Sequence, residues 1–480
     1  MNCAVDDYSD DNFSDGPQIT IADYAETRLP APPLPREFSA AGDRLGLKLF
    51  ALFLGALYLA IVVFDDFRSL GVATLFISVI AHLPFVIALI SKRACFIDGP
   101  DTPRSDEALP IYSILIPVYH EANMMAHIAR SLAAIDYPHD RLDLLILIEA
   151  DDSETREAAE RISWPAFVRL LTVLAEGPKT KPRACNFGLA NARGNLVVIY
   201  DAEDQPHPRQ LRDAAARFHN APPDLACLQA PLIIDNHKNK WLAAMFALEY
   251  RLLFTRFLPV LANCGCIIPL GGTSNHFRVD VLRKTGAWDS HNLTEDADLG
   301  MRMAYFGYRS EMITPPTFEN APHGLKIFLR QRIRWQSGHI QTISVHLRQP
   351  LRAMRSAGVF NYALFILVLL CRLTNPIAHM FMIGYLLTAS ATVGFLIPSL
   401  IMVSAFVYFF YFTLAYLALG KNSQHMHLIY LLSLPAYWLL IAPATLIALY
   451  RMARGQMAWM KTPHRPFRHR TYGKTCKWSG

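Results

Sequence analysis

Long apolar runs on both sides of a region of mixed polarity restrict what this 480-residue chain can fold into. Leu45–Phe64 and Gly71–Ile90 each have about the 20 residues that a helix needs to cross a bilayer. Residues 360–450 are almost continuously apolar. In residues 94–350, short apolar runs alternate with helix-like stretches, which is typical of an α/β domain. The sequence therefore predicts an α/β domain inserted between α-helical transmembrane segments.

The composition is that of a chain with both soluble and membrane-embedded parts. Hydrophobic residues make up 52% of the chain and charged residues 18%, which is below the usual quarter. These values exclude a disordered scaffold and are unusual for an ordinary soluble enzyme. The eight cysteines are scattered, so we expect reduced thiols rather than a disulfide or zinc framework.

The distribution of charge predicts how the chain is oriented. The segment 91–93 (Ser-Lys-Arg) follows the second apolar run and places its end in the cytoplasm. Residues 1–44 hold nine acidic residues against three arginines, which predicts a mobile acidic tail on the same side. Residues 451–480 hold eight lysines or arginines and no acid, which favours a lipid surface over nucleic acid as partner. We expect a multi-pass protein of the cell inner (plasma) membrane with its central domain in the cytoplasm.

Residues 351–450 are predicted to form a transmembrane bundle after the hairpin at 45–93 and the domain at 94–350. An even number of spans keeps the basic tail in the cytoplasm, so we expect four, with three as the alternative. Arg372 is costly in lipid and is expected to snorkel to an interface or, alternatively, to face a polar path. The four predicted spans are Phe360–Arg372, Pro376–Ser390, Phe395–Leu419 and His427–Tyr450.

The central region is predicted to contain a largely parallel sheet, which binds ligands at the carboxyl ends of its strands. Trp241–Leu270 is expected to form helices that lie at the membrane interface or, alternatively, pack in the core. The predicted strands are Ile111–Val118, Leu144–Ile148, Phe167–Leu174, Leu196–Tyr200 and Leu225–Pro231, and the predicted helices are Ala122–Ala134, Ser153–Ile162, Lys181–Ala192, Pro208–Phe218 and Leu325–Gln341.

Polar residues follow the first two predicted strands. After the first strand, which Pro117 helps to end, Tyr119 and Glu121 are suited to hold a base or a ribose. Asp151 and Asp152 follow the second strand, where capping of the next helix by Asp152 or Ser153 is an equally good interpretation.

A basic helix start and an acidic strand end predict a site for phosphate and metal. Lys181 and Arg183 lie in the first turn of a helix, where cations are unfavourable unless an anion offsets them. Asp201, Glu203 and Asp204 directly follow a buried strand. Their mutual repulsion is relieved by Mg²⁺ or Mn²⁺, which binds such oxygens and bridges to substrate phosphates. A solvated acidic turn is the alternative.

Two later helices carry further candidates. The segment 294–296 (Thr-Glu-Asp) begins a helix that Thr294 is expected to cap, although acids are common in any first turn. Gln331, Arg334 and Trp335 stand at i, i+3 and i+4 and share one face that suits a sugar-like ligand. Arg332 is expected to point away from that face, toward lipid headgroups. A plain interfacial amphipathic helix is the alternative.

Taken in this order, the segments resemble the membrane-integrated family 2 glycosyltransferases of the cellulose synthase and hyaluronan synthase type. That family combines a nucleotide-sugar (GT-A-like) domain with D, DxD, TED-like and QxxRW motifs. The resemblance covers about residues 45–465. The matching residues are Asp151 or Asp152, Asp201-Ala202-Glu203, Thr294-Glu295-Asp296, and Gln331 with Arg334 and Trp335.

The resemblance implies a role for each matched residue. Asp296 would be the general base, and Asp201 with Glu203 or Asp204 would hold Mg²⁺ or Mn²⁺. Trp459, Lys461 and Thr462 resemble a gating segment that closes over the donor. The implied donor-binding residues are Pro117, Tyr119, Glu121, Asp151, Asp152, Lys181, Arg183, Asp201 and Glu203. The residues implied to surround the acceptor and the leaving diphosphate are Gly272, Thr273, Glu295, Gln331, Arg334 and Trp335.

The chain also departs from the family pattern. Its DxD motif is a DxE followed by Asp204, which leaves the metal-binding pair open. Arg183 stands where the family usually has lysine, with Lys181 two residues earlier. About 30 residues follow the last predicted span, too few for a cyclic-di-GMP-binding barrel, so a regulator would be a separate subunit.

The resemblance implies an inverting enzyme that adds sugar from a UDP-sugar, with glucose as our choice, to a growing β-linked polysaccharide. It further implies export of that polymer, with accessory or export subunits as possible partners and no nucleic acid. One rival is a non-processive transferase that adds a single sugar to a membrane glycolipid. Another is a membrane receptor that binds nucleotide without catalysis.

Overall fold

The computed structural model describes residues 34–41, 106–174, 177–236, 240–389, 412, 416 and 430–455. Several predictions fall outside these ranges and stay predictions. They are the hairpin at 45–93, nearly all of the span at 395–419, most of the acidic tail, and the gating residues Trp459, Lys461 and Thr462.

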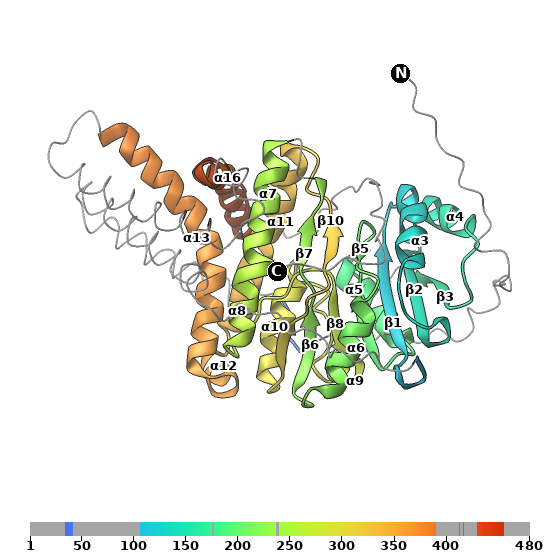
Figure 1. Cartoon of the computed structure of the whole chain (residues 1–480). Coiled ribbons are helices and arrows are strands. Elements are labelled where there is room, and N and C mark those ends of the chain that lie inside the picture. Colours follow the sequence, from blue (N-terminus) through green and yellow to red (C-terminus); the bar gives the residue numbers. More distant parts are fainter. Residues whose placement is uncertain are drawn as a thin grey trace, which may run out of the picture.

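A seven-stranded sheet forms the centre of the domain (Figure 1), in the order β3-β2-β1-β4-β8-β6-β9. Its neighbours are parallel except at β8, which runs antiparallel to both β4 and β6. The prediction of a largely parallel sheet is thus confirmed, whereas β8 carries no apolar run and was not predicted. The strands are β1 (Tyr112–Val118), β2 (Leu142–Glu149), β3 (Val168–Val173), β4 (Leu196–Ile199), β6 (Leu225–Gln229), β8 (Asn275–Arg278) and β9 (Arg309–Met312).

Helices cover both faces of this sheet, because successive side chains of each strand point to opposite sides. In β1, Leu115 packs into the core beneath α5, while Ile114 and Ile116 pack into the core beneath α3 and α6. These helices agree with the predicted ones to within two residues at each end when the 3₁₀ turn before α3 is counted as part of it. Their bounds are α3 (Met125–Ala133, preceded by the 3₁₀ turn Ala122–Met124), α4 (Ser153–Glu160), α5 (Lys181–Asn191) and α6 (Gln210–Asn220).

The second half of the domain adds a small sheet and several helices beside the carboxyl ends of β1 and β4. The sheet has the order β5-β10-β7, with β10 antiparallel to β5 and parallel to β7. Its strands are β5 (Gln205–Pro206), β7 (Leu232–Ile234) and β10 (Thr317–Glu319). The helices are α7 (Trp241–Leu252, continued by a π-helical turn to Phe257), α8 (Leu258–Asn263), α9 (Val279–Lys284), α10 (Glu295–Tyr305) and α11 (Leu325–His346).

The segment that was predicted to be interfacial or core is mostly core. Met245, Phe246 and Leu252 of α7 and Leu258 of α8 are buried in the same cluster as the sheet and α5. Trp241 at the start of α7 remains more exposed. The described structure therefore supports the core alternative for this stretch.

The apolar C-terminal region forms longer helices than predicted. After α12 (Pro350–Ala357), α13 runs unbroken from Val359 to Ala389, so the two short spans predicted there are one helix. Pro376 lies inside α13, where it leaves the carbonyl of Arg372 without its helical N–H donor. The side-chain amide of Gln336 on α11 donates to this carbonyl at 3.1 Å. A neighbouring helix thus satisfies the group that the proline releases.

Two described helical stretches are long and apolar enough to cross a bilayer. They are Val359–Ile377 within α13 and Leu434–Ala453, which is α16. Both α13 and α16 pack against α11 and against each other. Figure 1 shows these helices together at one end of the domain, away from β1, β2 and β3.

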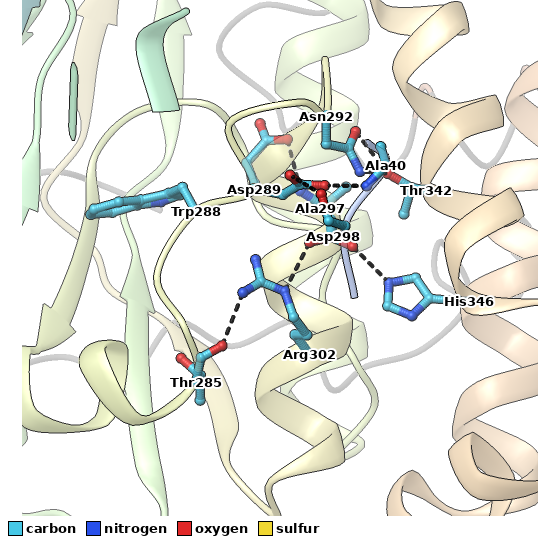
Figure 2. Close-up of polar contacts among 12 residues, drawn as sticks. Ala40, Thr285, Trp288, Asp289, Asn292, Ala297, Asp298, Arg302, Thr342 and His346 are labelled. Atoms are coloured by element: carbon cyan, nitrogen blue, oxygen red, sulfur yellow. Dashed lines mark hydrogen bonds and ion pairs between the residues drawn. The ribbon is translucent and has the colours of Figure 1, made fainter. Parts of the chain in front are cut away.

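A buried ion network anchors α10, the helix that begins with Glu295 (Figure 2). Arg302 is fully buried and donates through Nε to Asp298 at 2.9 Å and through Nη1 to the carbonyl of Thr285 at 2.9 Å. Nε2 of His346 on α11 lies 3.0 Å from the other carboxylate oxygen of Asp298. Burial by itself raises the pKa of Asp298, but Arg302 and His346 outweigh it and lower that pKa.

We expect Arg302→Ala to destabilise the fold strongly, because it leaves the Asp298 carboxylate buried without its main partner. Removing one member of a buried ion pair typically costs about 3–5 kcal/mol. Thermal unfolding of the purified protein in detergent measures the effect. Lys284→Ala, which removes an exposed ion pair to Asp280, is the control and should leave the midpoint nearly unchanged. Equal midpoints for both variants would contradict this account of α10.

Candidate active site

One cavity at the carboxyl ends of β1, β2 and β4 brings together most of the residues singled out in the sequence. Its walls come from these strand ends, the starts of α5 and α10, the 269–273 loop, and α7, α11 and α13. Asp151, Asp152, Arg183 and Asp204 were also expected in the site but do not line the cavity. The predicted residues that do line it are Pro117, Tyr119, Glu121, Lys181, Asp201, Glu203, Gly272, Thr273, Glu295, Asp296, Gln331, Arg334 and Trp335.

The first turn of α5 places a cation at the centre of the cavity. Lys181 forms an ion pair with Asp201 and donates a hydrogen bond of 2.7 Å to the carbonyl of Gly272. Burial opposes the charge of Lys181, but Asp201 and Glu295 raise the pKa of its ammonium group above the usual value. A Cβ added at Gly272 would lie 3.4 Å from Oδ2 of Asp296 and 3.9 Å from Nζ of Lys181. Gly272 therefore keeps open the space between this cation and Asp296.

Arg183 has a different role from Lys181 although both lie in the same turn. Its guanidinium pairs with Glu149 at 2.5 Å and also donates to the carbonyl of Leu174. Glu149 lines the cavity, and burial raises the pKa of its carboxyl against the opposing effect of Arg183. The structure thus places Arg183 behind the cavity wall and Lys181 inside it.

The acidic turn after β4 divides its carboxylates between two environments. Asp201 and Glu203 line the cavity. Asp204 points into the protein, where it accepts a hydrogen bond from Thr273 and another, of 2.7 Å, from the backbone N–H of Asp201. Burial and the nearby charges of Asp201 and Glu203 raise the pKa of Asp204 well above normal. The structure therefore separates Asp204 from the other two predicted metal ligands.

Two cavity carboxylates suit a metal ion that also binds substrate. Among the described residues, no group of three or more His, Cys, Asp or Glu side chains has an arrangement that would hold a metal by itself. Mg²⁺ and Mn²⁺ sites in enzymes of phosphorylated substrates commonly use only one or two protein carboxylates and take the remaining ligands from phosphate and water. Asp201 and Glu203 fit that kind of site.

Tyr119 and Lys179 line one end of the cavity, and both contact Asp151 just outside its wall. The Tyr119 hydroxyl donates to Asp151 at 3.4 Å, and Asp151 forms an ion pair with Lys179. Lys179 lines the cavity and was missed in the sequence, because a lysine in a loop carries no pattern. Asp152 instead caps α4 by accepting from the Thr155 N–H at 3.2 Å, which confirms the capping interpretation.

Helix α10 directs two acids toward Lys181 and Arg334. Glu295 and Asp296 are half-buried in the cavity wall, and burial raises the pKa of both carboxyl groups. Lys181 and Arg334 oppose this rise in each case. Thr294 was expected to cap α10, but its hydroxyl lies 3.1 Å from that of Thr342 on α11 and makes no capping bond.

Helix α11 presents the predicted polar face to the cavity. Gln331, Arg334 and Trp335 all line it, which confirms their shared face. Oε1 of Gln331 and Nε of Arg334 are buried and have no hydrogen-bond partner within the described part of the chain. Gly338, one turn later, approaches α10 so closely that a Cβ there would lie 2.5 Å from the Thr294 methyl group. This contact brings α11 and its polar face against the start of α10.

Arg332 was expected to face lipid headgroups, but the structure buries it behind Trp335. Its guanidinium pairs with Glu249 of α7 at 2.5 Å and donates to the Tyr437 hydroxyl of α16 at 2.8 Å. It also lies 4.6 Å from the centre of the Trp335 ring. The expectation was wrong because a single helix cannot reveal that α7 and α16 bring an acid and aromatic rings to this side.

The cavity also contains residues that sequence reasoning missed or placed elsewhere. Arg372 lines it, as the alternative of a polar path would require. Glu249 is the single acid of the apolar helix α7, a signal that could have been used. Glu319 ends the short strand β10, where nothing in the sequence marks it. Burial and the charges of Asp204 and Glu203 raise the pKa of Glu319 well above normal.

Comparisons with known proteins agree with this architecture. Residues 110–338 match the model of "Glycosyltransferase like family 2". A probable glycosyltransferase, YdaM, of Bacillus subtilis is 22% identical over 76% of this chain and 89% of its own length. A beta-monoglucosyldiacylglycerol synthase of Trichormus variabilis is 24% identical over 64% of each chain. A probable glucomannan 4-beta-mannosyltransferase of Arabidopsis thaliana is 23% identical over 59% of this chain and 51% of its own.

A solved structure shares the fold. The mannosyltransferase PcManGT of Pyrobaculum calidifontis, in complex with GDP-Man and Mn²⁺, superposes with a TM-score of 0.52 and 19% identity. The match covers 79% of this chain and 99% of that one. The family match and the relatives support a family 2 glycosyltransferase domain at residues 110–338, and the shared fold is GT-A-like.

Proposed function

We propose that this chain is an inverting glycosyltransferase in which Asp296 deprotonates the acceptor hydroxyl. The acceptor oxygen forms a bond to the anomeric carbon as the bond from that carbon to the diphosphate oxygen breaks. The proton goes to Asp296, and the bonding electrons leave with the diphosphate. The observation that carries this proposal is the convergence of Asp296, Lys181 and Arg334 on one cavity. A single displacement of this kind inverts the anomeric configuration.

The donor is proposed to be a nucleotide sugar that lies between Tyr119 and Lys181. Tyr119, Asp151 and Lys179 offer a ring and polar groups at one end of the cavity, suited to base and ribose. Lys181 offers a cation for the diphosphate farther in. Bound Mg²⁺ or Mn²⁺ at Asp201 and Glu203 would neutralise charge that develops on the leaving diphosphate. The Mn²⁺ bound by PcManGT supports a divalent ion here.

The acceptor is proposed to enter along α11. Oε1 of Gln331 and Nε of Arg334 are buried without a hydrogen-bond partner in the described part of the chain. Because such atoms are costly to leave unpaired, we propose that the acceptor supplies their hydrogen bonds. Trp335 beside them offers a flat ring for a sugar. His339 of α11 and Arg372 of α13 also line the cavity, so its wall includes polar side chains from both helices. We therefore propose a growing β-linked polysaccharide as acceptor, glucose from UDP-glucose as the added unit, and export of the product past the apolar helices.

A lipid acceptor is the second candidate. It is favoured by Arg372, which brings the cavity to a helix that is apolar enough to span a bilayer. The similarity to a beta-monoglucosyldiacylglycerol synthase points the same way. A receptor without catalysis has less support, because the residues proposed for catalysis are all present in the cavity.

The described N-terminal residues support the proposed membrane hairpin. Residues 34–41 pack against the catalytic domain, and Asp106, where the chain is described again, pairs with Arg212 of the same domain at 2.7 Å. Because both ends of the intervening stretch lie on one body, any crossings within it must be even in number. Its two apolar runs would meet that condition as a hairpin. We propose a multi-pass membrane protein with the catalytic domain in the cytoplasm.

Product analysis tests which acceptor is used. Purified protein in detergent or liposomes is supplied with Mg²⁺ and labelled UDP-glucose, with labelled GDP-mannose in a parallel reaction. We expect high-molecular-weight product that linkage-specific β-glucanases digest. Label confined to a lipid-soluble, single-sugar product would show that the acceptor is a membrane lipid and not a polysaccharide. A lack of transfer from every nucleotide sugar offered would contradict the proposed activity.

Asp296→Asn should abolish most turnover while donor binding persists. The amide keeps the shape of the side chain but cannot accept the acceptor proton, and loss of a general base typically costs about 10²–10⁴-fold in rate. Steady-state transfer and UDP binding by calorimetry are measured on the same preparation. Asp280→Asn, on the exposed surface of α9, is the control. Loss of UDP binding in Asp296→Asn together with its activity would count against the assignment of a base.

The rate should fall in mildly acidic solution. A base must be deprotonated to act, and burial raises the pKa of Asp296, so its proton is retained to a higher pH than on an ordinary aspartate. We expect the acidic limb of the kcat/KM profile to have its midpoint at least one unit above the usual aspartate value of about 3.9. Thermal unfolding at each pH separates this limb from denaturation. A profile that stays flat down to that usual value would be inconsistent with a buried base.

A further inference from the structure

The N-terminal segment 34–41 was expected to belong to a mobile tail but packs tightly against the domain. Phe38, Ser39 and Ala40 are buried. The Phe38 ring meets the edge of Tyr305, at the end of α10, with ring centres 5.7 Å apart. The Arg352 guanidinium of α12 covers the same ring at 5.4 Å. Residues of α10 and α12, far apart in the sequence, thus form the surface against which this segment packs.

The segment also provides hydrogen bonds to one buried acid. Oγ of Ser39 donates to Oδ1 of Asp289 at 2.9 Å, and the Ala40 N–H donates to Oδ2 at 2.6 Å. Asp289 is only 1% exposed. Within the described part of the chain, its other hydrogen bond comes from the backbone N–H of His291, at 3.1 Å. Without the segment, one carboxylate oxygen would be buried with no donor and the other would keep a single one, which is costly for a charged group.

Asp289 lies in the loop that leads into the proposed base. Its carbonyl accepts from the Asn292 N–H at 3.1 Å, and the Asn292 side chain accepts from the Thr294 N–H at 3.0 Å. Thr294 directly precedes Glu295 and Asp296. Figure 2 shows Ala40, Asp289, Asn292 and Asp298 gathered around the start of α10. Hydrogen bonds through Asp289 and Asn292 therefore connect residues 39 and 40 to Thr294, the residue before α10.

We propose that residues 34–41 are a positioning segment that holds the 289–294 loop, and through it Asp296, in the geometry needed for transfer. This inference rests on the proposed role of Asp296 as the base. Ser39 and Asp289 do not line the cavity and would act only through the loop. The segment would thus tie the region before the first apolar run to the catalytic centre.

The experiment compares full-length variants that differ only in these contacts. Ser39→Ala removes the hydroxyl donor, and the double variant Ser39→Ala/Ala40→Pro also removes the backbone donor to Asp289. Glu37→Gln is the matched control on the same segment, because it removes only an exposed ion pair to Arg352. Initial rates are measured with the donor that the wild-type protein uses, and hydrogen exchange of residues 286–299 is followed without substrate.

We expect the double variant to lose about 10–100-fold in kcat, since a base displaced by about 1 Å can cost that much, while the donor KM stays nearly constant. Exchange should rise in residues 286–299, with Ser39→Ala intermediate and Glu37→Gln unchanged in both measurements. Wild-type kcat and exchange in both Ser39 variants would overturn the proposal. A loss of thermal stability with unchanged kcat would also overturn it, because the segment would then be a simple anchor.

Failure of the proposed function gives a different result. If Asp296→Asn keeps wild-type turnover, the base is misassigned whatever the segment does. If Asp296→Asn is inactive and the Ser39 variants are unaffected, only the positioning role fails.

Discussion

The site depends on one half-buried lysine. Lys181 sits between the Asp201 carboxylate and the Gly272 carbonyl, close to the acids that begin α10. Without this cation the cavity would hold several carboxylates with few counter-charges, and burial already raises the pKa of Glu295, Asp296 and Glu319. The ion pair with Asp201 joins the start of α5 to the end of β4. The carboxylates of the cavity need positive counter-charge, which explains why an anionic donor and a divalent cation fit together in it.

Helix α11 connects this centre to the apolar helices. Gly338 allows it to touch the start of α10, and Arg332 ties it to α7 and α16 through Glu249 and Tyr437. The Gln336 amide satisfies the carbonyl that Pro376 leaves free in α13. The helix proposed to shape the acceptor end therefore also contacts both candidate membrane spans. Arg332 contacts both Tyr437 of α16 and the ring of Trp335. A movement of α16 would therefore shift the side chain of Trp335.

Local patterns predicted the local parts of this structure. Apolar strands that alternate with helices revealed the α/β domain, and helical spacing placed Gln331, Arg334 and Trp335 on one face. Long-range contacts had no local signal. The inward turn of Asp204 depends on Thr273, and the docking of residues 34–41 depends on Asp289. In both cases the acid is buried by a partner about 70 or 250 residues away in the sequence.

The stereochemistry of the product tests the central claim most directly, because a single displacement by one base must invert the anomeric carbon. Product made from an α-linked nucleotide sugar is isolated, and its new linkage is assigned by proton NMR from the coupling of the anomeric hydrogen. The account predicts a β-linkage. An α-linkage would mean retention of configuration and would contradict the assignment of Asp296 as the base of a single displacement.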